Sequence, residues 1–133
     1  TGGSINAVTE YLNLWAREAG KVENFHLLRY EDLRAEPHRE LRKMLDFMQI
    51  DATDADVDAA VEYSAYENMK KMEGKQQFRL AGGRMMPRDK DNPNSYKVRR
   101  AKVGGYRDYF SDEEVAAIDQ RLAETLDPLF KYS

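Results

Sequence analysis

Apolar residues recur at spacings of three and four near the start of the chain, which is the period of an amphipathic helix. Ser4 is a typical N-cap before this stretch, and Gly20 is a typical end signal after it. The pattern therefore predicts a helix over residues 5–19. Its apolar stripe consists of Ile5, Val8, Leu12, Trp15 and Ala19.

A short apolar run follows at residues 23–30, and its length favours one buried strand of about six residues. A single strand leaves its backbone hydrogen-bonding groups without partners. Its neighbours are therefore expected to come from outside this chain or from a second copy of it. An exposed strand of this kind also favours association between chains.

Three further helices are predicted between residues 37 and 74. Pro37 suits the first position of one helix, and Thr53, followed by acidic residues, suits the start of the next. A short helix over residues 66–73 ends at Gly74. The apolar faces expected on the first two are Leu41, Met44, Leu45 and Met48, then Val57, Ala60 and Val61.

Residues 75–110 show no sustained period and contain several glycines and prolines, so we expect a long loop that is functional or mobile. Ser111 and Glu114 then form a capping box, which predicts a last helix that ends at Asp127 and Pro128. The pattern predicts a mainly α chain with one or two short strands. The last helix is expected to face inward through Val115, Ile118, Leu122 and Leu126.

Composition narrows the class of protein. The 133 residues are 41% hydrophobic and 34% charged, which is typical of one soluble globular domain, and no apolar run is long enough to span a membrane. The chain has no cysteine, which excludes disulfides, a thiol nucleophile and cysteine metal sites. The only histidines are His26 and His38, so no metal site is expected. The absence of cysteine agrees with a reducing compartment such as the cytoplasm.

Charge is distributed unevenly along the chain. Residues 84–107 hold eight basic and two acidic side chains, a charge of +6, whereas the remainder holds 13 basic and 22 acidic side chains, a charge of −9. The acidic balance argues against a nucleic-acid partner. The basic segment indicates either a local anion site or a solvated surface.

Residues 99–110 place cations, small residues and aromatics just before the last predicted helix. Guanidinium groups bind phosphate oxygens through paired hydrogen bonds, and small residues let backbone N–H groups approach an anion. Tyr106 and Phe110 are expected to anchor the end of the loop in the core. The residues alone leave two readings open, a phosphate site and a basic surface loop.

This segment resembles the C-terminal signature of the cytosolic-type sulfotransferases, R-K-G-x-x-G-D-W-K-x-x-F. Arg99 and Arg100 match its first two cations, and Gly104, Arg107 and Phe110 match later positions. Three upstream stretches, residues 28–33, 36–47 and 64–69, resemble other family segments in the same order. From the first to the last, the four stretches span roughly residues 25–112, about two-thirds of the chain.

The resemblance implies a P-loop-like, three-layer α/β fold for the parent protein. Residues 1–133 would be the C-terminal part of one sulfotransferase domain, with residues 75–110 as the loop that carries the 3′-phosphate segment. The family transfers a sulfuryl group from 3′-phosphoadenosine 5′-phosphosulfate to a hydroxyl or amine. Carried over by position, the residues that bind the 3′-phosphate are Arg99, Arg100 and, through its backbone N–H, Ala101. Those near the adenine are Tyr30, Ser64, Tyr66 and Met69.

The chain departs from the family pattern at several positions, among them Gly105 in place of aspartate and Tyr106 in place of tryptophan. Ala101 stands where the signature has glycine, and alanine costs about 1 kcal/mol if that position needs a positive φ. The family's phosphate loop and catalytic histidine have no match here, and neither His26 nor His38 is assigned that role. We therefore expect no catalytic residue and no turnover in this chain alone, with a missing N-terminal half or a second copy as partner.

Two other functions remain open at the level of sequence. One is a small helical protein-interaction module with a mobile basic loop. The other is binding of single-stranded nucleic acid through interleaved cations and aromatics, which the acidic remainder of the chain opposes.

Overall fold

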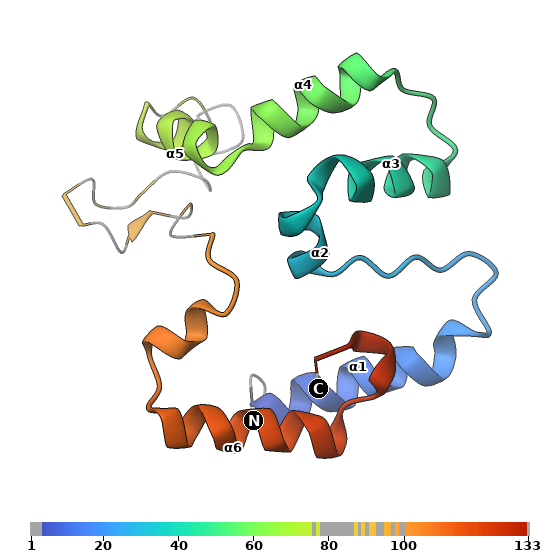
Figure 1. The fold of residues 1–133 in the computed structure, drawn as a ribbon, viewed down its shortest axis with the longest axis vertical. Coiled ribbons are helices and arrows are strands. Elements are labelled where there is room, and N and C mark those ends of the chain that lie inside the picture. Colours follow the sequence, from blue (N-terminus) through green and yellow to red (C-terminus); the bar gives the residue numbers. More distant parts are fainter. Residues whose placement is uncertain are drawn as a thin grey trace. The chain divides into compact units, whose positions relative to one another are not determined.

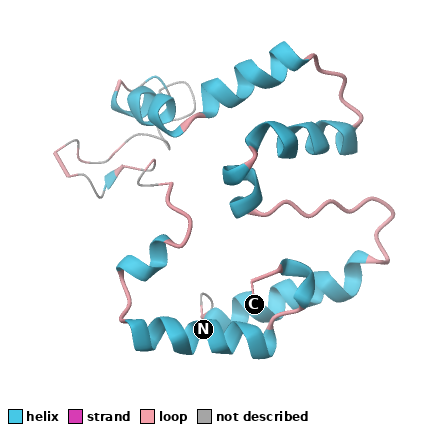
Figure 2. Cartoon of the chain, viewed as in Figure 1, coloured by secondary structure: helices cyan, strands magenta, loops and turns pink. Residues whose placement is uncertain are grey.

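The structure is a computed structural model that describes residues 4–75, 77, 87, 89, 91, 92, 95, 96, 98 and 101–132. The regular elements of this part of the chain are helices, as the mainly α prediction required, and no strand occurs in it (Figure 2). None of its helices has the length and apolarity needed to cross a bilayer. The chain divides into two compact units, Thr1–Arg29 with Tyr106–Ser133, and Tyr30–Gly105.

The first unit contains α1 (Ile5–Ala19), α6 (Asp112–Thr125) and a short 3₁₀ helix, η4 (Pro128–Phe130) (Figure 1). Hydrogen bonds from Asn13 in α1 reach both sides of the end of α6. Its side-chain amide donates to the Thr125 carbonyl at 2.6 Å and accepts from the Asp127 N–H at 2.8 Å. The buried side chains of this unit are Thr9, Val115, Leu126 and Phe130.

The predicted boundaries of α1 and α6 are confirmed. Ser4 accepts a hydrogen bond from the Ala7 N–H at 3.3 Å, and Ser111 with Glu114 forms the reciprocal capping box at the start of α6. Gly20 follows α1 with φ −70°, so it ends the helix without entering the left-handed region. The apolar stripe of α1 is largely exposed in this unit.

The second unit is a chain of four helices in which each packs against the next (Figure 1). Thr53 and Asp56 form a capping box at the start of the third, and Arg42 in the second donates to the Ala52 carbonyl at 2.6 Å. These local contacts fix the turn between the two helices. The four elements are α2 (Tyr30–Ala35), α3 (Pro37–Met48), α4 (Asp54–Ser64) and α5 (Tyr66–Gly74).

The prediction of a strand within residues 23–30 is wrong in this structure. Residues 25–29 lie in neither a helix nor a strand, and α2 begins at Tyr30. A strand forms only where a neighbouring strand completes its hydrogen bonds, and the described residues supply none. Glu31 and Asp32 instead occupy the first turn of α2, where acidic groups are stabilised by the positive end of the helix.

Burial on α3 also differs from the prediction. Met48, expected to face the core, is 47% exposed, whereas Glu40 is 4% exposed. The Glu40 carboxylate accepts from Lys43 at 2.8 Å and from Arg39 at 2.9 Å. These hydrogen bonds, from Lys43 first and Arg39 second, hold the pKa of Glu40 below its ordinary value. A residue that the hydrophobic pattern treats as polar surface is thus buried because its charge is neutralised locally.

Candidate functional site

Two residues in the described part of the basic segment adopt the left-handed backbone conformation. Ala101 has φ +46° and Gly104 has φ +70°. Residue 101 is the position that the sulfotransferase signature fills with glycine, and it does adopt the positive φ that makes alanine costly. Arg99 and Arg100, the two predicted guanidinium ligands, lie outside the described residues.

The segment continues into a 3₁₀ helix, η3 (Gly105–Asp108), and meets α6 at one carboxylate. The Tyr106 hydroxyl donates to Asp119 Oδ1 at 3.0 Å, and Arg107 Nη2 lies 2.9 Å from Asp119 Oδ2. The Arg107 guanidinium also sits 5.2 Å from the centre of the Tyr106 ring. Asp119 therefore holds an aromatic and a cation of the segment together on α6.

The pKa values of both partners of Asp119 lie above their ordinary values. Burial comes first for the pKa of the Tyr106 phenol, followed by the hydrogen bond to Asp119. The pKa of Arg107 is raised chiefly by its hydrogen bond to Asp119. The tyrosine is thus held neutral and the arginine charged, which suits a fixed structural contact.

The expectation that aromatic residues anchor this segment in the core is wrong. Tyr106 is 39% exposed and Phe110 is 45% exposed. Tyr106 is attached through its hydroxyl, the polar part of a ring that often remains at a surface. The fixed point of the segment is therefore a polar contact.

Three of the four predicted adenine-side residues meet at the junction of α4 and α5. Ser64 is the last residue of α4, and its hydroxyl donates to the Val61 carbonyl at 3.3 Å. Tyr66 opens α5 with the Lys70 ammonium 5.5 Å from its ring centre, and Met69 lies one turn later. Both are half-buried.

Tyr30, the fourth, belongs to a different helix. It is the first residue of α2 and is 47% exposed. The helix α2 packs against α3, which packs against α4 in turn. Tyr30 therefore belongs to the first helix of this series, whereas the other three residues lie where the third helix meets the fourth.

A buried carboxylate that the sequence analysis missed lies on the same helix as Tyr66. Glu73 in α5 is 0% exposed, and its Oε2 accepts a hydrogen bond of 2.8 Å from the Val98 N–H. Residues 66, 69 and 73 are three and four positions apart, so they share one face of α5. The spacing of these three residues can be read from the sequence. The contact of Glu73 with Val98, 25 residues away, cannot.

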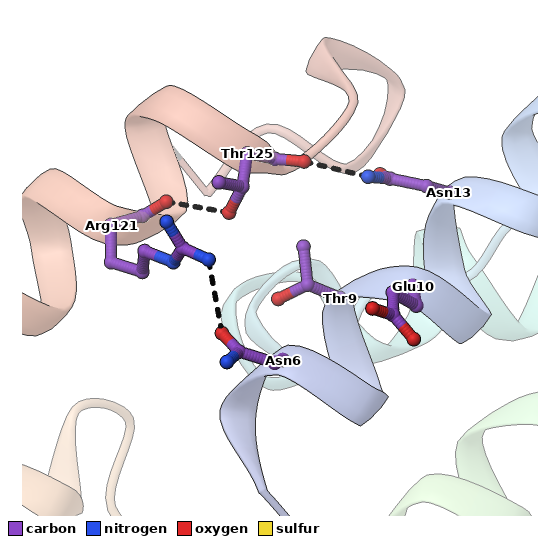
Figure 3. A pocket seen from close by; sticks show the side chains of 6 residues that line it. All are labelled: Asn6, Thr9, Glu10, Asn13, Arg121 and Thr125. Atoms are coloured by element: carbon purple, nitrogen blue, oxygen red, sulfur yellow. Dashed lines mark hydrogen bonds between the residues drawn. The ribbon is translucent and has the colours of Figure 1, made fainter.

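A polar cavity of about 240 Å³ lies in the first unit between α1 and α6 (Figure 3). Arg121 Nη2 donates to Asn6 Oδ1 at 3.3 Å across it. None of the predicted site residues lines this cavity. The described part of the chain also gathers no cluster of three carboxylates or histidines suited to a metal ion. The cavity is lined by Asn6, Thr9, Glu10, Asn13, Arg121 and Thr125.

Comparison with known proteins identifies the family. The sequence model of the sulfotransferase domain matches residues 4–130. The chain is 26% identical to a flavonol 3-sulfotransferase from Flaveria bidentis over 121 residues, and 23% identical to a flavonol 4′-sulfotransferase from Flaveria chlorifolia over 120 residues. No solved structure gives a significant match.

Each of these matches covers 86% of this chain, but 37% and 36% of the respective relative. The chain thus spans little more than a third of the length of the curated relatives that it matches. The family model, by contrast, extends over nearly the whole chain, from the N-cap of α1 to the end of η4. The chain therefore belongs to the sulfotransferase family.

Proposed function

We propose that this chain forms the adenine and 3′-phosphate side of the donor site in a sulfotransferase that uses 3′-phosphoadenosine 5′-phosphosulfate. The observation that carries the proposal is the backbone at Ala101. Where the family signature has glycine, φ is +46°, a conformation that glycine favours. A positive φ at this position supports the proposal, because it is a conformation in which the glycine of the signature would be unstrained.

The chemistry of the segment supports the same function. The side chains of Arg99 and Arg100 provide the paired donors that a phosphate group requires. The backbone N–H of Ala101 adds a donor in a left-handed turn, a conformation that recurs in anion-binding loops. At the α4–α5 junction, Tyr66 and Met69 offer a ring and a thioether to the adenine face, and Ser64 offers a hydroxyl to its edge.

Sulfuryl transfer needs further groups. A bond forms between the acceptor oxygen or nitrogen and sulfur, the bond from sulfur to the 5′-phosphate oxygen breaks, and a base takes the acceptor proton. We assign neither the base nor the 5′-phosphate loop to these 133 residues. They act as the C-terminal part of one P-loop-like α/β domain, with residues 75–110 as the loop that carries the 3′-phosphate segment, and a cytoplasmic location remains a prediction.

Binding of adenosine 3′,5′-bisphosphate, measured by calorimetry, tests the proposal. Replacing both Arg99 and Arg100 by alanine removes charge-assisted hydrogen bonds and should weaken binding by about tenfold or more. A matched control, Arg17→Ala with Lys21→Ala, removes the same charge from the exposed end of α1 and should leave the affinity unchanged. Equal binding of inorganic triphosphate, or equal losses in both double variants, would contradict a specific nucleotide site.

A separate assay tests the missing chemistry. The 133-residue chain should bind the bisphosphate without transferring sulfate to phenols, sugars or amines. Turnover by this chain alone would show that the base and the 5′-phosphate ligands are present in it after all.

The alternative, a helical interaction module with a mobile basic loop, draws on the exposed apolar side chains of α1, such as Val8 at 52% and Trp15 at 40%. It predicts self-association or partner binding that is insensitive to nucleotide. The calorimetric titration separates the two proposals, since only a donor site prefers the bisphosphate to other anions.

A further inference from the structure

We propose that Glu73 is a positioning residue that couples the adenine side of the nucleotide site to its 3′-phosphate side. The inference rests on the proposed function, and it assigns a role to a group that the donor-site residues do not include. The structural basis is the hydrogen bond between Glu73 Oε2 and the backbone N–H of Val98.

The first argument is the cost of burial. Glu73 is 0% exposed, and a buried carboxylate is expensive unless hydrogen bonds satisfy it. A leucine of similar size would fill this space without that cost. A glutamate at such a place therefore serves a contact that leucine cannot make, and the Val98 N–H at 2.8 Å is such a contact.

The second argument is the shared face of α5. Tyr66, Met69 and Glu73 follow one another at spacings of three and four, so one rigid helix carries all three. Tyr66 and Met69 lie in its first turns and Glu73 in its last. A displacement of α5 therefore moves the adenine wall and the anchor for Val98 together.

The third argument is the position of Val98 in the chain. Val98 directly precedes Arg99 and Arg100 in the sequence. The Glu73 contact fixes the backbone N–H at the point where the 3′-phosphate segment begins. Two parts of a site that must grip one nucleotide at fixed separation are thereby linked through one buried acceptor, and such supporting contacts set binding geometry.

Paired nucleotides separate this role from a general structural one. The affinities of adenosine 3′,5′-bisphosphate and adenosine 5′-monophosphate, which lacks the 3′-phosphate, are measured by calorimetry on the full chain. Glu73→Leu removes the acceptor at similar volume and should lower bisphosphate affinity by about tenfold, with a change under about twofold for the monophosphate. Glu73→Gln keeps a carbonyl acceptor and should retain most of the preference.

Glu67→Leu, which removes an exposed carboxylate from the first turn of the same helix, is the matched control and should preserve the ratio of the two affinities. Should Glu73→Leu fail to fold, Glu73→Asp shortens the side chain by one methylene and should lower the same ratio. Far-ultraviolet circular dichroism verifies that each variant is helical.

The outcomes distinguish this inference from the function on which it rests. A wild-type chain that binds neither nucleotide overturns the proposed function and this inference with it. Wild-type preference for the bisphosphate that persists unchanged in Glu73→Leu, or equal losses for both nucleotides, overturns the positioning role alone. A selective loss that Glu73→Gln largely restores supports it.

Discussion

The hydroxyl of Tyr106 donates a 3.0 Å hydrogen bond to Asp119, and the second oxygen of that carboxylate lies 2.9 Å from Arg107. Both donors belong to the segment that resembles the sulfotransferase signature. Asp119 therefore attaches the end of this segment to α6. The cation at Arg107 is engaged in this attachment, in contrast to the arginines at 99 and 100 that the proposed function assigns to phosphate.

The shared carboxylate predicts that the effects of Tyr106→Phe and Asp119→Ala on stability are not additive. Each substitution breaks the same hydrogen bond, so the double variant should lose less stability than the two single variants together. Thermal melting of the four proteins, followed by circular dichroism, measures this. Tyr109→Phe, at a ring that is 67% exposed, is the control and should melt as the wild type does. Additive losses would show that the contact contributes nothing to the folded chain.

The raised pKa of Tyr106 predicts a loss of stability in alkali. The unfolded phenol ionises near its ordinary value of 10.0, while burial and Asp119 raise the pKa of the folded one. The unfolded state therefore loses its proton first, and the free energy of unfolding falls as pH rises above about 10. The stability difference between wild type and Tyr106→Phe should be constant below about pH 9 and shrink above about pH 10. Urea unfolding at several pH values measures it, and a difference that does not change would contradict the assignment.

The left-handed backbone at Ala101 predicts that glycine stabilises the chain there. Ala101→Gly relieves a steric cost, partly offset by the greater freedom of glycine in the unfolded state, for a net gain of about 0.5–1 kcal/mol. Ala60→Gly, in the right-handed interior of α4, should instead destabilise by about 1 kcal/mol. Urea denaturation measures both. Destabilisation at both positions would show that residue 101 does not populate positive φ in solution.

The two hydrogen bonds that Asn13 makes between α1 and the end of α6 predict that Asn13→Ala strongly lowers stability. The substitution removes two hydrogen bonds and leaves the Thr125 carbonyl and the Asp127 N–H without their partner, at a cost of about 1–3 kcal/mol. Asn6→Ala removes one longer, exposed contact to Arg121 and should cost much less. Equal losses of stability in urea denaturation would show that the Asn13 hydrogen bonds are not what joins these elements.

Local signals account for the parts of the fold that the sequence predicted. Ser4, Thr53 and Ser111 each cap a helix through a residue three positions away, so a short window of sequence contains both partners. The strand at residues 23–30 could not be judged in this way, because a strand depends on a partner elsewhere. The six-residue helix α2 was missed because so short an element has no measurable period.

The same distinction holds for the candidate site. The resemblance to the signature drew attention to the segment around Ala101 and to the residues proposed for the adenine side at the α4–α5 junction, since each is a contiguous motif. Glu73 escaped notice because its partner is the backbone of Val98, which carries no side-chain signal. The role of Asp119 was equally hidden, because its two donors lie 12 and 13 residues away.

The stacking of Trp15 on Phe25, with ring centres 6.3 Å apart, places the chain's one tryptophan in the unit that contains α1 and α6. The unit that spans Tyr30–Gly105 has no indole of its own. Intrinsic emission at long wavelength is therefore an optical reporter for one half of the molecule. Quenching or a spectral shift on addition of nucleotide would show that binding changes the surroundings of Trp15.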